Sequence, residues 1–268
     1  MKPHFLSVPA HIPRKRFGQH FLHDAAILQR IVECIAPHAD DRLVEIGPGE
    51  GALTLPLLKA AGSLTAIELD RDLIEPLRAR VQGMGELTIV NADALTVDLH
   101  KLAQGKPLRL VGNLPYNIST PILFHCLDHA DDIRDMHFML QKEVVERMAA
   151  GPGSKIYGRL SVMLQLRCRV EPLLQVPPGA FRPPPKVDSA VVRLIPLPPA
   201  ALPNVDMSLL ERIVRAAFGQ RRKTLGNALS GIATSAQMHA AGIDPRARAE
   251  QLPPSAFVAL AHTLSCKT

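Results

Sequence analysis

The segment that decides the fold combines a short apolar strand with a glycine-rich turn. Its sequence is Leu43-Val44-Glu45-Ile46-Gly47-Pro48-Gly49-Glu50-Gly51. Residues 43–46 are typical of a buried strand, and residues 52–61 predict a helix directly after the turn. Glycine lets the backbone turn tightly and approach a ligand closely. The segment therefore predicts a strand, a turn and a helix that together bind a nucleoside-containing cofactor, and the alternative is a glycine-rich turn that serves packing only.

Strands and helices alternate on both sides of this segment. The elements expected around it are strands at residues 64–68, 87–90, 108–111 and 136–140, and helices at residues 25–36 and 72–82. Asp24 stands at the N-cap position of the first of these helices. Such alternation implies a mostly parallel sheet covered by helices, with ligands at the carboxyl ends of its strands. We therefore expect an α/β, Rossmann-like fold.

The C-terminal part of the chain has a different pattern. Residues 195–203 are dense in proline and lack charge, which is typical of a stiff linker. Residues 207–219 and several shorter segments after them predict helices, and Asp244-Pro245 matches an N-cap followed by proline at the first helical position. We expect an α/β domain with a basic N-terminal arm at residues 1–200 and a small all-helical domain at residues 204–268.

Basic residues gather at the two ends of the chain. Residues 1–20 hold four basic and no acidic residues, residues 201–268 hold eight and four, and residues 21–200 hold 19 and 21. Basic ends on a slightly acidic body favour a polyanion held from the flanks, although a surface that is merely basic overall gives the same counts. The two clusters expected to contact RNA phosphates are Arg14-Lys15-Arg16 and Arg221-Arg222-Lys223.

Other classes of protein find little support in the sequence. No apolar run reaches the roughly 18 residues of a membrane span, and the N-terminus lacks the apolar core of a signal peptide. The four cysteines form no CxxC pair, which indicates reduced thiols and not a metal site. We expect a cytoplasmic monomer with no membrane partner and no metal.

Two carboxylates follow the next strands and complete the expected cofactor site. Glu68 ends the second strand, 21 residues after Gly47, where it can accept hydrogen bonds from both ribose hydroxyls. Asp93 follows the third strand and can accept from an adenine amine, although an Asp there is also a common helix cap. The spacing Gly47-x-Gly49-x-x-Ala52 equally satisfies the dinucleotide fingerprint, so an NAD-dependent oxidoreductase is an alternative.

The segment Asn113-Leu114-Pro115-Tyr116 follows the fourth strand and matches the chemistry of adenine methylation. The exocyclic amine is a poor nucleophile because its lone pair is delocalised into the ring. Two acceptors that hold both N–H bonds favour a pyramidal nitrogen, and the Asn113 side-chain oxygen and the Leu114 carbonyl can serve as these acceptors. Pro115 biases Leu114 away from helical backbone, and Tyr116 can stack on the base. The alternative interpretation is an ordinary turn.

Taken together, the motifs resemble a known family, the small-subunit ribosomal RNA adenine dimethyltransferases, which share a broader family with the erythromycin-resistance methylases. The segments that carry the resemblance are Arg16-Phe17-Gly18-Gln19-His20-Phe21-Leu22, residues 45–51, Ile67-Glu68-Leu69-Asp70, residues 91–95, residues 113–119, residues 181–189 and residues 218–225. They extend over nearly the whole chain.

The resemblance implies a cofactor, substrate and site residues. The cofactor would be S-adenosylmethionine, and its implied contacts are His20, Leu22, Gly47, Glu68, Asp93 and Asn113, to which the glycine turn adds Gly49. Phe181 stands in a proline-rich stretch expected to be a loop, where an aromatic is more often a local packing anchor, but the resemblance implies that it closes on the target base opposite Tyr116. The substrate would be two adjacent adenines in a hairpin near the 3′ end of small-subunit (16S) rRNA in the 30S particle, each receiving two methyl groups. The family usually has Asn where this chain has His20.

Three other hypotheses remain at this point. An oxidoreductase would need a hydride-handling pair such as Tyr/Lys or His/Asp, and none stands at a recognisable spacing. A ribosome-assembly factor without catalysis would share the RNA-binding features. A methylase of a single adenine in large-subunit rRNA would share the catalytic segment, and only the resemblance of the C-terminal part favours the small subunit.

Overall fold

The computed structural model describes residues 20–220 and 222–265. Its strands are β1 Phe21–Leu22, β2 Arg42–Ile46, β3 Ser63–Ile67, β4 Glu86–Val90, β5 Leu108–Asn113, β6 Ile133–Gln141, β7 Cys168–Val176, β8 Phe181–Arg182 and β9 Ser189–Pro196. Its α-helices are α1 Ala25–Ile35, α2 Thr54–Ala61, α3 Ile74–Val81, α4 Leu99–Ala103, α5 Ser119–Asp128, α6 Lys142–Ala149, α7 Arg159–Gln165, α8 Met207–Gly219, α9 Leu225–Ala228, α10 Ser235–Ala240 and α11 Pro254–Ser265.

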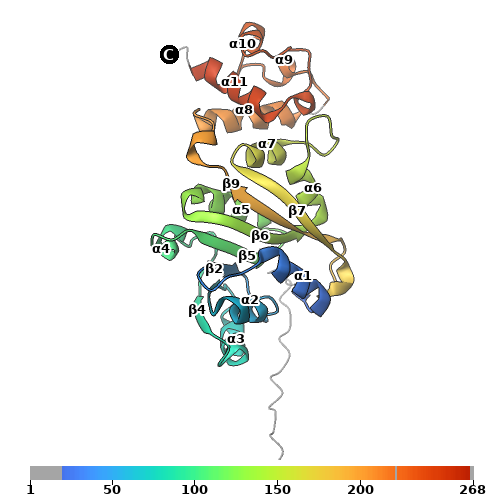
Figure 1. Cartoon of the computed structure of the whole chain (residues 1–268). Helices are drawn as coiled ribbons and strands as arrows, with labels where there is room; N and C mark the ends of the chain where they lie inside the picture. Colours follow the sequence, from blue (N-terminus) through green and yellow to red (C-terminus); the bar gives the residue numbers. More distant parts are fainter. Residues whose placement is uncertain (1–19, 221, 266–268) are drawn as a thin grey trace, which may run out of the picture. The chain divides into compact units, whose positions relative to one another are not determined.

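Seven strands form one sheet in the order β4-β3-β2-β5-β6-β9-β7 (Figure 1). The pairs β2–β3, β3–β4, β2–β5 and β5–β6 are all parallel. Chain order runs outward from β2 in one direction through β3 and β4, and then resumes on the other side of β2 at β5. This reversal is the topological switch point at which open α/β sheets bind ligands. The expected α/β, Rossmann-like sheet is confirmed.

Helices α1, α2 and α3 cover one face of the sheet (Figure 1). Ile31 of α1, Leu57 of α2 and Leu77 of α3 are almost fully buried in the same cluster as Val111 of β5. The expected N-cap of α1 is present, because the Asp24 carboxylate accepts from the backbone N–H groups of residues 26 and 27 at 3.0 Å. Burial of three amphipathic helices on one face therefore supplies the core that holds the strand ends in place.

Helix α2 begins at Thr54, two residues later than its sequence pattern predicts. The residues before it form a turn, and Gly51 adopts a φ of +85° there. A Cβ at Gly51 would lie 2.5 Å from Cδ1 of Leu77, so the turn packs directly against α3. Apolar periodicity extends back into this turn because Leu53 also contacts the core.

A network of charged side chains is buried beneath the end of α1. Arg109 of β5 donates to Asp41 at 2.6 Å and to Asp135 of β6 at 2.9 Å. Two further bonds from Arg109 reach the carbonyl oxygens of residues 35 and 36 at the carboxyl end of α1. Burial alone would raise the pKa of Asp41 and of Asp135, but the bonds and charges of Arg109 lower both pKa values overall. The network thus ties α1 to β5 and β6.

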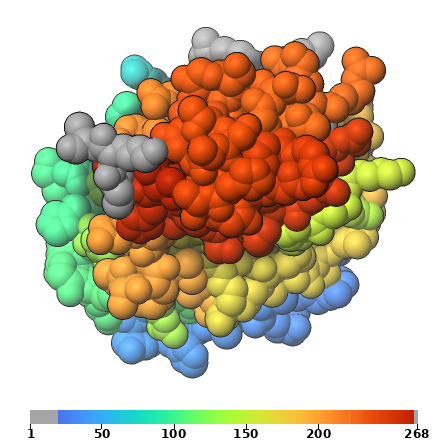
Figure 2. Space-filling view, turned by 90° about the horizontal axis from the view of Figure 1, so that it is seen from above, coloured from blue at the N-terminus to red at the C-terminus, as the bar shows by residue number. Residues whose placement is uncertain are grey.

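The chain divides into two compact units, one of residues 1–142 with 173–193 and one of residues 143–172 with 194–268. In the second unit the rings of Tyr157, Phe218 and Phe257 pack in a chain with centroids 5.8 Å apart. The Tyr157 hydroxyl donates to the Leu252 carbonyl at 2.9 Å. Figure 2 looks onto the atoms of this C-terminal part, which are coloured orange to red. The division into functional domains at 1–200 and 204–268 stays a proposal.

Two local expectations for this C-terminal part need correction. Asp244-Pro245 opens a turn and not a helix, because the Asp244 carboxylate accepts from the Arg246 backbone N–H at 2.9 Å and closes a local loop. Strand β9 also extends through Pro196, into the stretch expected to be linker. By contrast, α8 spans residues 207–219 as predicted. No helix within the described ranges combines the length and apolarity that a membrane span requires.

Candidate active site

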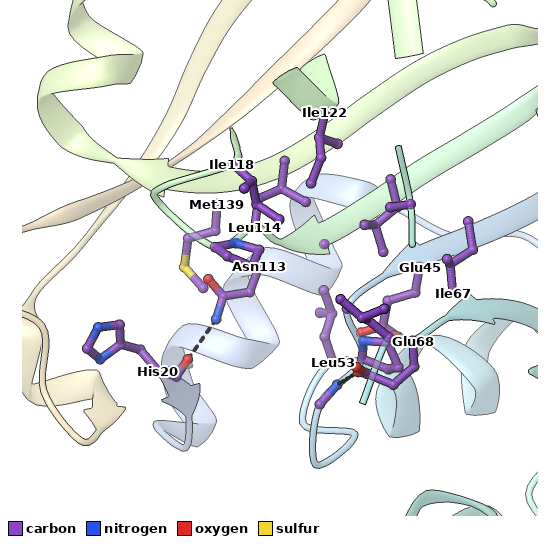
Figure 3. A pocket seen from close by; sticks show the side chains of 18 of the residues that line it. His20, Glu45, Leu53, Ile67, Glu68, Asn113, Leu114, Ile118, Ile122 and Met139 are labelled. Atoms are coloured by element: carbon purple, nitrogen blue, oxygen red, sulfur yellow. Dashed lines mark hydrogen bonds between the residues drawn. The ribbon is translucent and has the colours of Figure 1, made fainter. Parts of the chain in front are cut away.

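A cavity of about 300 Å³ lies at the carboxyl ends of β2, β3, β4 and β5, in the first unit (Figure 3). The predicted cofactor and catalytic residues that line it are His20, Leu22, Gly47, Gly49, Glu68, Asp93, Asn113, Leu114, Pro115 and Tyr116. These residues come together because parallel strands end at one edge of the sheet, on both sides of the switch point. The predicted set therefore forms one site, with the single exception of Phe181.

Glu68 lines this cavity on the side of Leu53 and Glu45 (Figure 3). One carboxylate oxygen accepts from the Gly49 N–H at 3.1 Å and the other from the Asp70 N–H at 2.8 Å. Burial raises the pKa of Glu68, and these two bonds oppose the rise. Gly49 reaches this position with a φ of +56°, and a Cβ there would lie 2.9 Å from the Phe21 ring. Each oxygen keeps lone-pair capacity for a further donor, so the carboxylate fits a vicinal diol.

Asp93 combines the two roles that the sequence left open. Its Oδ1 accepts from the Leu95 N–H at 3.0 Å and so caps the turn after β4. Within the described residues no donor is bonded to its Oδ2. Capping by one oxygen fixes the carboxylate, and the other oxygen remains available at the cavity to an amine donor.

Two buried titratable groups also line the cavity at the level of Val111. Glu45 pairs in register with Val111, which in turn pairs with His137. Burial raises the pKa of Glu45 to about 7, although the Thr54 hydroxyl donates to it at 2.6 Å. Burial lowers the pKa of His137 to about 4, and the Asp135 carboxylate, 3.9 Å from its Nδ1, opposes this fall. At neutral pH His137 is therefore an uncharged ring inside the fold.

The Asn113 side chain is oriented by the N-terminal segment. Its Nδ2 donates to the His20 carbonyl oxygen at 2.8 Å (Figure 3). A carbonyl oxygen can only accept, so this bond settles which way the amide points. The Leu114 N–H donates to the Met139 carbonyl at 3.1 Å and fixes the next peptide. Among residues 20–220 and 222–265, no donor is bonded to Asn113 Oδ1 or to the Leu114 carbonyl oxygen. Two adjacent acceptors therefore remain for a substrate.

Tyr116 is held by its hydroxyl and faces a second ring. The hydroxyl makes a 2.6 Å hydrogen bond with the Ser189 hydroxyl at the start of β9. Burial raises the pKa of Tyr116, so the phenol is neutral. The His20 imidazole stacks on the Tyr116 ring, with centroids 5.8 Å apart and an interplanar angle of 28°. A flat aromatic surface thus stands beside the two acceptors.

Phe181 lies elsewhere than the resemblance implies. It pairs with Leu22 in the two-stranded β1–β8 sheet and is 2% exposed in the hydrophobic core. It does not line the cavity. Its role opposite Tyr116 stays a prediction.

The predicted RNA contacts lie mostly beyond the described residues. Arg14, Lys15, Arg16 and Arg221 lie outside the described ranges. Arg222 and Lys223 are exposed in the turn that follows α8. No three His, Cys, Asp or Glu side chains within the described ranges lie close enough together to hold a metal ion.

Sequence reasoning missed three contributors to the site, namely Ser189, Glu45 and His137. Ser189 stands in the quoted segment 181–189, but nothing in that segment indicates that its hydroxyl meets Tyr116, 73 residues away. Glu45 interrupts an apolar strand, and such an interruption is a usable signal for a buried polar role. His137 interrupts the apolar strand β6 in the same way.

The sheet order, the switch point and the site at the strand ends define a class of protein. These three features are typical of the Rossmann-like, S-adenosylmethionine-dependent methyltransferases. The family model described as ribosomal RNA adenine dimethylase matches residues 10–265. The chain belongs to the ribosomal RNA adenine dimethylase family.

Individual relatives agree with this assignment. The chain is 60% identical over 256 residues to ribosomal RNA small subunit methyltransferase A of Xanthomonas euvesicatoria pv. vesicatoria (strain 85-10), covering 96% of this chain and 97% of the relative. It resembles the structure of a dimethyladenosine transferase from Plasmodium falciparum with a TM-score of 0.75 and 27% identity, covering 90% of this chain and 96% of that one. For the 23S rRNA methyltransferase ErmE the TM-score is 0.70 and the identity 29%, covering 91% and 99%. The family resemblance of the sequence is confirmed.

Proposed function

We propose that this protein transfers methyl groups from S-adenosylmethionine to the N6 amines of two adjacent adenosines near the 3′ end of small-subunit (16S) rRNA, giving dimethyladenosine. The observation that carries the proposal is the pair of open acceptors at the end of β5, Asn113 Oδ1 and the Leu114 carbonyl oxygen. An N6 amine has two N–H bonds, and the adjacent acceptors match them. Family membership supports the same reaction.

The chain's residues fit the proposed cofactor. Glu68 offers a buried carboxylate for the ribose hydroxyls, and Asp93 Oδ2 offers an acceptor for the adenine amine. Gly47 and Gly49 bring backbone close to the cavity, and His20 and Leu22 close its other side. When bound, S-adenosylmethionine supplies a methyl group that its sulfonium charge has already activated.

The catalytic contribution of the protein is mainly orientation. Asn113 and Leu114 hold the amine by its two protons, which favours a pyramidal nitrogen with an available lone pair. Tyr116 stacks on the base, and its bond to Ser189 keeps the ring from turning. Fixing a reactant in its attack geometry lowers the barrier without a strong base.

The RNA partner and its setting are part of the proposal. Relatives at 60% identity carry a small-subunit name, and this supports the small subunit over the large-subunit substrate of the ErmE neighbour. We place the reaction on the 30S particle in the cytoplasm, during ribosome biogenesis, with the protein acting as a monomer. Arg222 and Lys223, together with Arg221 and residues 14–16 outside the described ranges, would contact phosphates and position the RNA without reading its sequence.

The test uses unmethylated 30S particles, purified 50S particles and labelled cofactor. We expect label only in small-subunit rRNA, recovered as dimethyladenosine by mass spectrometry. The Asn113→Ala variant should still bind the particle while its rate of transfer falls about 100-fold or more, the loss typical when one preorganised polar group is removed. Calorimetry of cofactor binding is the control, because Asn113 also holds the His20 carbonyl.

Several results would contradict the proposal. Label in 50S particles alone would make the large subunit the substrate. Full activity of Asn113→Ala would rule out the acceptor mechanism. Particle binding by the unaltered protein without any transfer would indicate an assembly factor that is not an enzyme.

A further inference from the structure

The backbone pairing of β3 with β4 ends at the level of Glu68, the carboxylate proposed to bind the ribose. The last partners in register are Ile67 and Val90, and one further bond joins the Glu68 N–H to the Val90 carbonyl oxygen at 3.0 Å. Beyond it, no backbone N–H within the described residues is bonded to the carbonyl oxygen of Glu68 or of Leu69. These two carbonyl groups therefore need a donor from a side chain.

Asn91, the residue directly after β4, provides this donor. Its Nδ2 donates to the Glu68 carbonyl oxygen at 2.7 Å and, at 3.4 Å, to the Leu69 carbonyl oxygen. Carbonyl oxygens only accept, so the two partners settle which way the Asn91 amide points. Asn91 itself does not line the cavity. Its side chain can therefore influence a ligand only through the backbone that it holds.

The peptide between Leu69 and Asp70 connects Asn91 to the Glu68 carboxylate. This peptide is trans and planar, so its C=O and its N–H point in opposite directions. Its carbonyl oxygen accepts from Asn91 Nδ2. Its N–H, that of Asp70, donates to Glu68 Oε1 at 2.8 Å. A bond that holds one end of the peptide thus also aims the other end at the carboxylate.

We infer that Asn91 is a positioning residue for the ribose of the cofactor, because it orients the peptide that holds Glu68 Oε1. This inference rests on the proposed function. A hydrogen bond to a carboxylate weakens when its geometry is poor, so a less firmly held Glu68 binds hydroxyls less tightly. Asn91 is exposed, so water can replace its amide at the two carbonyl oxygens. Its removal therefore affects binding of the ribose more than folding.

Asp93, two residues after Asn91, is oriented by a bond of its own. Its Oδ1 accepts from the Leu95 N–H at 3.0 Å, within the turn after β4. The acceptor proposed for the adenine amine therefore does not depend on the Asn91 side chain. It follows that loss of Asn91 weakens recognition of the ribose and leaves recognition of the adenine amine intact.

Calorimetry with three nucleosides tests this difference. The probes are S-adenosylhomocysteine, its 2′,3′-dideoxy analogue, and its analogue with purine in place of adenine, which lacks the amine. The unaltered protein should bind the dideoxy analogue about 100-fold and the purine analogue about tenfold more weakly than the parent nucleoside. In Asn91→Ala, affinity for the parent should fall about tenfold and affinity for the dideoxy analogue less than about twofold. The ratio of the parent and purine affinities should stay within about twofold of its original value.

Further variants and a kinetic measurement make the assignment specific. Asn91→Asp keeps the shape of the side chain, but an ionised carboxylate cannot donate, so this variant should lose at least as much affinity as Asn91→Ala. Asn227→Ala removes an exposed asparagine of α9 and should leave all three affinities unchanged. On 30S particles, Asn91→Ala should raise the KM for S-adenosylmethionine about tenfold and change kcat less than about twofold, because the ribose is bound alike in substrate and transition state.

Four outcomes would overturn the inference. Equal losses of affinity for the parent and the dideoxy analogue in Asn91→Ala would show that the residue only supports the fold. A lost preference for the parent over the purine analogue would assign Asn91 to the adenine instead. Full affinity in Asn91→Asp would show that its donated bonds do not matter. Equal binding of parent and dideoxy analogue by the unaltered protein would separate Glu68, and Asn91 with it, from the ribose. Failure of the proposed function would differ from all four, since the unaltered protein would then transfer no methyl group to 30S particles.

Discussion

Tyr116 depends on one hydroxyl contact for its orientation. Its bond to Ser189 spans 2.6 Å, and the Ser189 side chain is fully buried at the start of β9. A buried hydroxyl that loses its partner costs more than the bond itself contributes, because it can no longer reach water. The position of the Tyr116 ring, which stacks on the base in the proposed reaction, is therefore coupled to β9, a strand outside residues 113–116.

Removing the Ser189 hydroxyl alone should lower stability and activity more than removing the Ser189 and Tyr116 hydroxyls together. We expect Ser189→Ala to lower the free energy of unfolding by about 1–2 kcal/mol and to reduce kcat/KM. The double variant with Tyr116→Phe should recover part of both losses, since no unpaired hydroxyl remains. Urea unfolding and steady-state kinetics of the four proteins in the cycle give the coupling. Strictly additive effects would show that the bond contributes nothing.

At the scale of elements, Arg109 joins three parts of the fold. Its guanidinium reaches the carbonyls at the end of α1 and the carboxylates of Asp41 and Asp135. The Arg109 side chain is 5% exposed, so its charge is shielded from water. An arginine can satisfy this set because it offers five donors in a rigid fork. The network fixes α1, whose Ile31 lines the cavity.

Arg109→Met should therefore destabilise the protein strongly. It leaves two buried carboxylates without their main partner, and we expect a loss of about 3–5 kcal/mol in the free energy of unfolding. Arg134→Met is the matched control, because Arg134 contacts the same Asp41 at 3.0 Å but is 57% exposed. That variant should lose no more than about 1 kcal/mol. Equal losses in a urea titration would refute the assigned role of the buried network.

At the scale of the whole molecule, Glu45 and His137 give opposite pH dependences of stability. The pKa of Glu45 rises from 4.5 to about 7 in the folded state, so between these values the folded protein binds more protons and stability falls as pH rises. The pKa of His137 falls from 6.5 to about 4, so between pH 4 and 6.5 the unfolded protein binds more protons and stability rises with pH. Between pH 4.5 and 6.5 the two effects offset each other.

Single substitutions should separate the two pH dependences of the free energy of unfolding. Glu45→Gln removes the carboxylate slope, so its stability relative to the unaltered protein should rise between pH 4.5 and 7 by up to about 3 kcal/mol. His137→Leu leaves the carboxylate slope, and its stability should fall by a similar amount between pH 4.5 and 7. Chemical denaturation at half-unit steps of pH measures both. Curves parallel to that of the unaltered protein would contradict the two pKa shifts.

Local sequence determined most of the elements and the cofactor side of the site. The strand at residues 43–46, the glycine turn and the strand-end positions of Glu68, Asp93 and Asn113 are set by periodicity and by chain order. Parallel strands end at one edge of the sheet, so these residues meet without any further information. The error at Asp244 has the opposite cause, because the N-cap of a helix and the start of a turn use the same residue types.

Tertiary structure alone decided which side chains surround Tyr116. Ser189 meets Tyr116, and His20 covers it, only because β9 and the β1–β8 pair bring distant segments to the end of β5. Phe181 lies in the core because its strand pairs with β1, and not in the loop where its proline-rich neighbours would place it. The periodicity of apolar residues predicts which residues share one face of an element. It does not predict which faces of distant elements pack together. The sequence by itself therefore determined which polar groups stand at the strand ends, and long-range packing decided which side chains contact Tyr116.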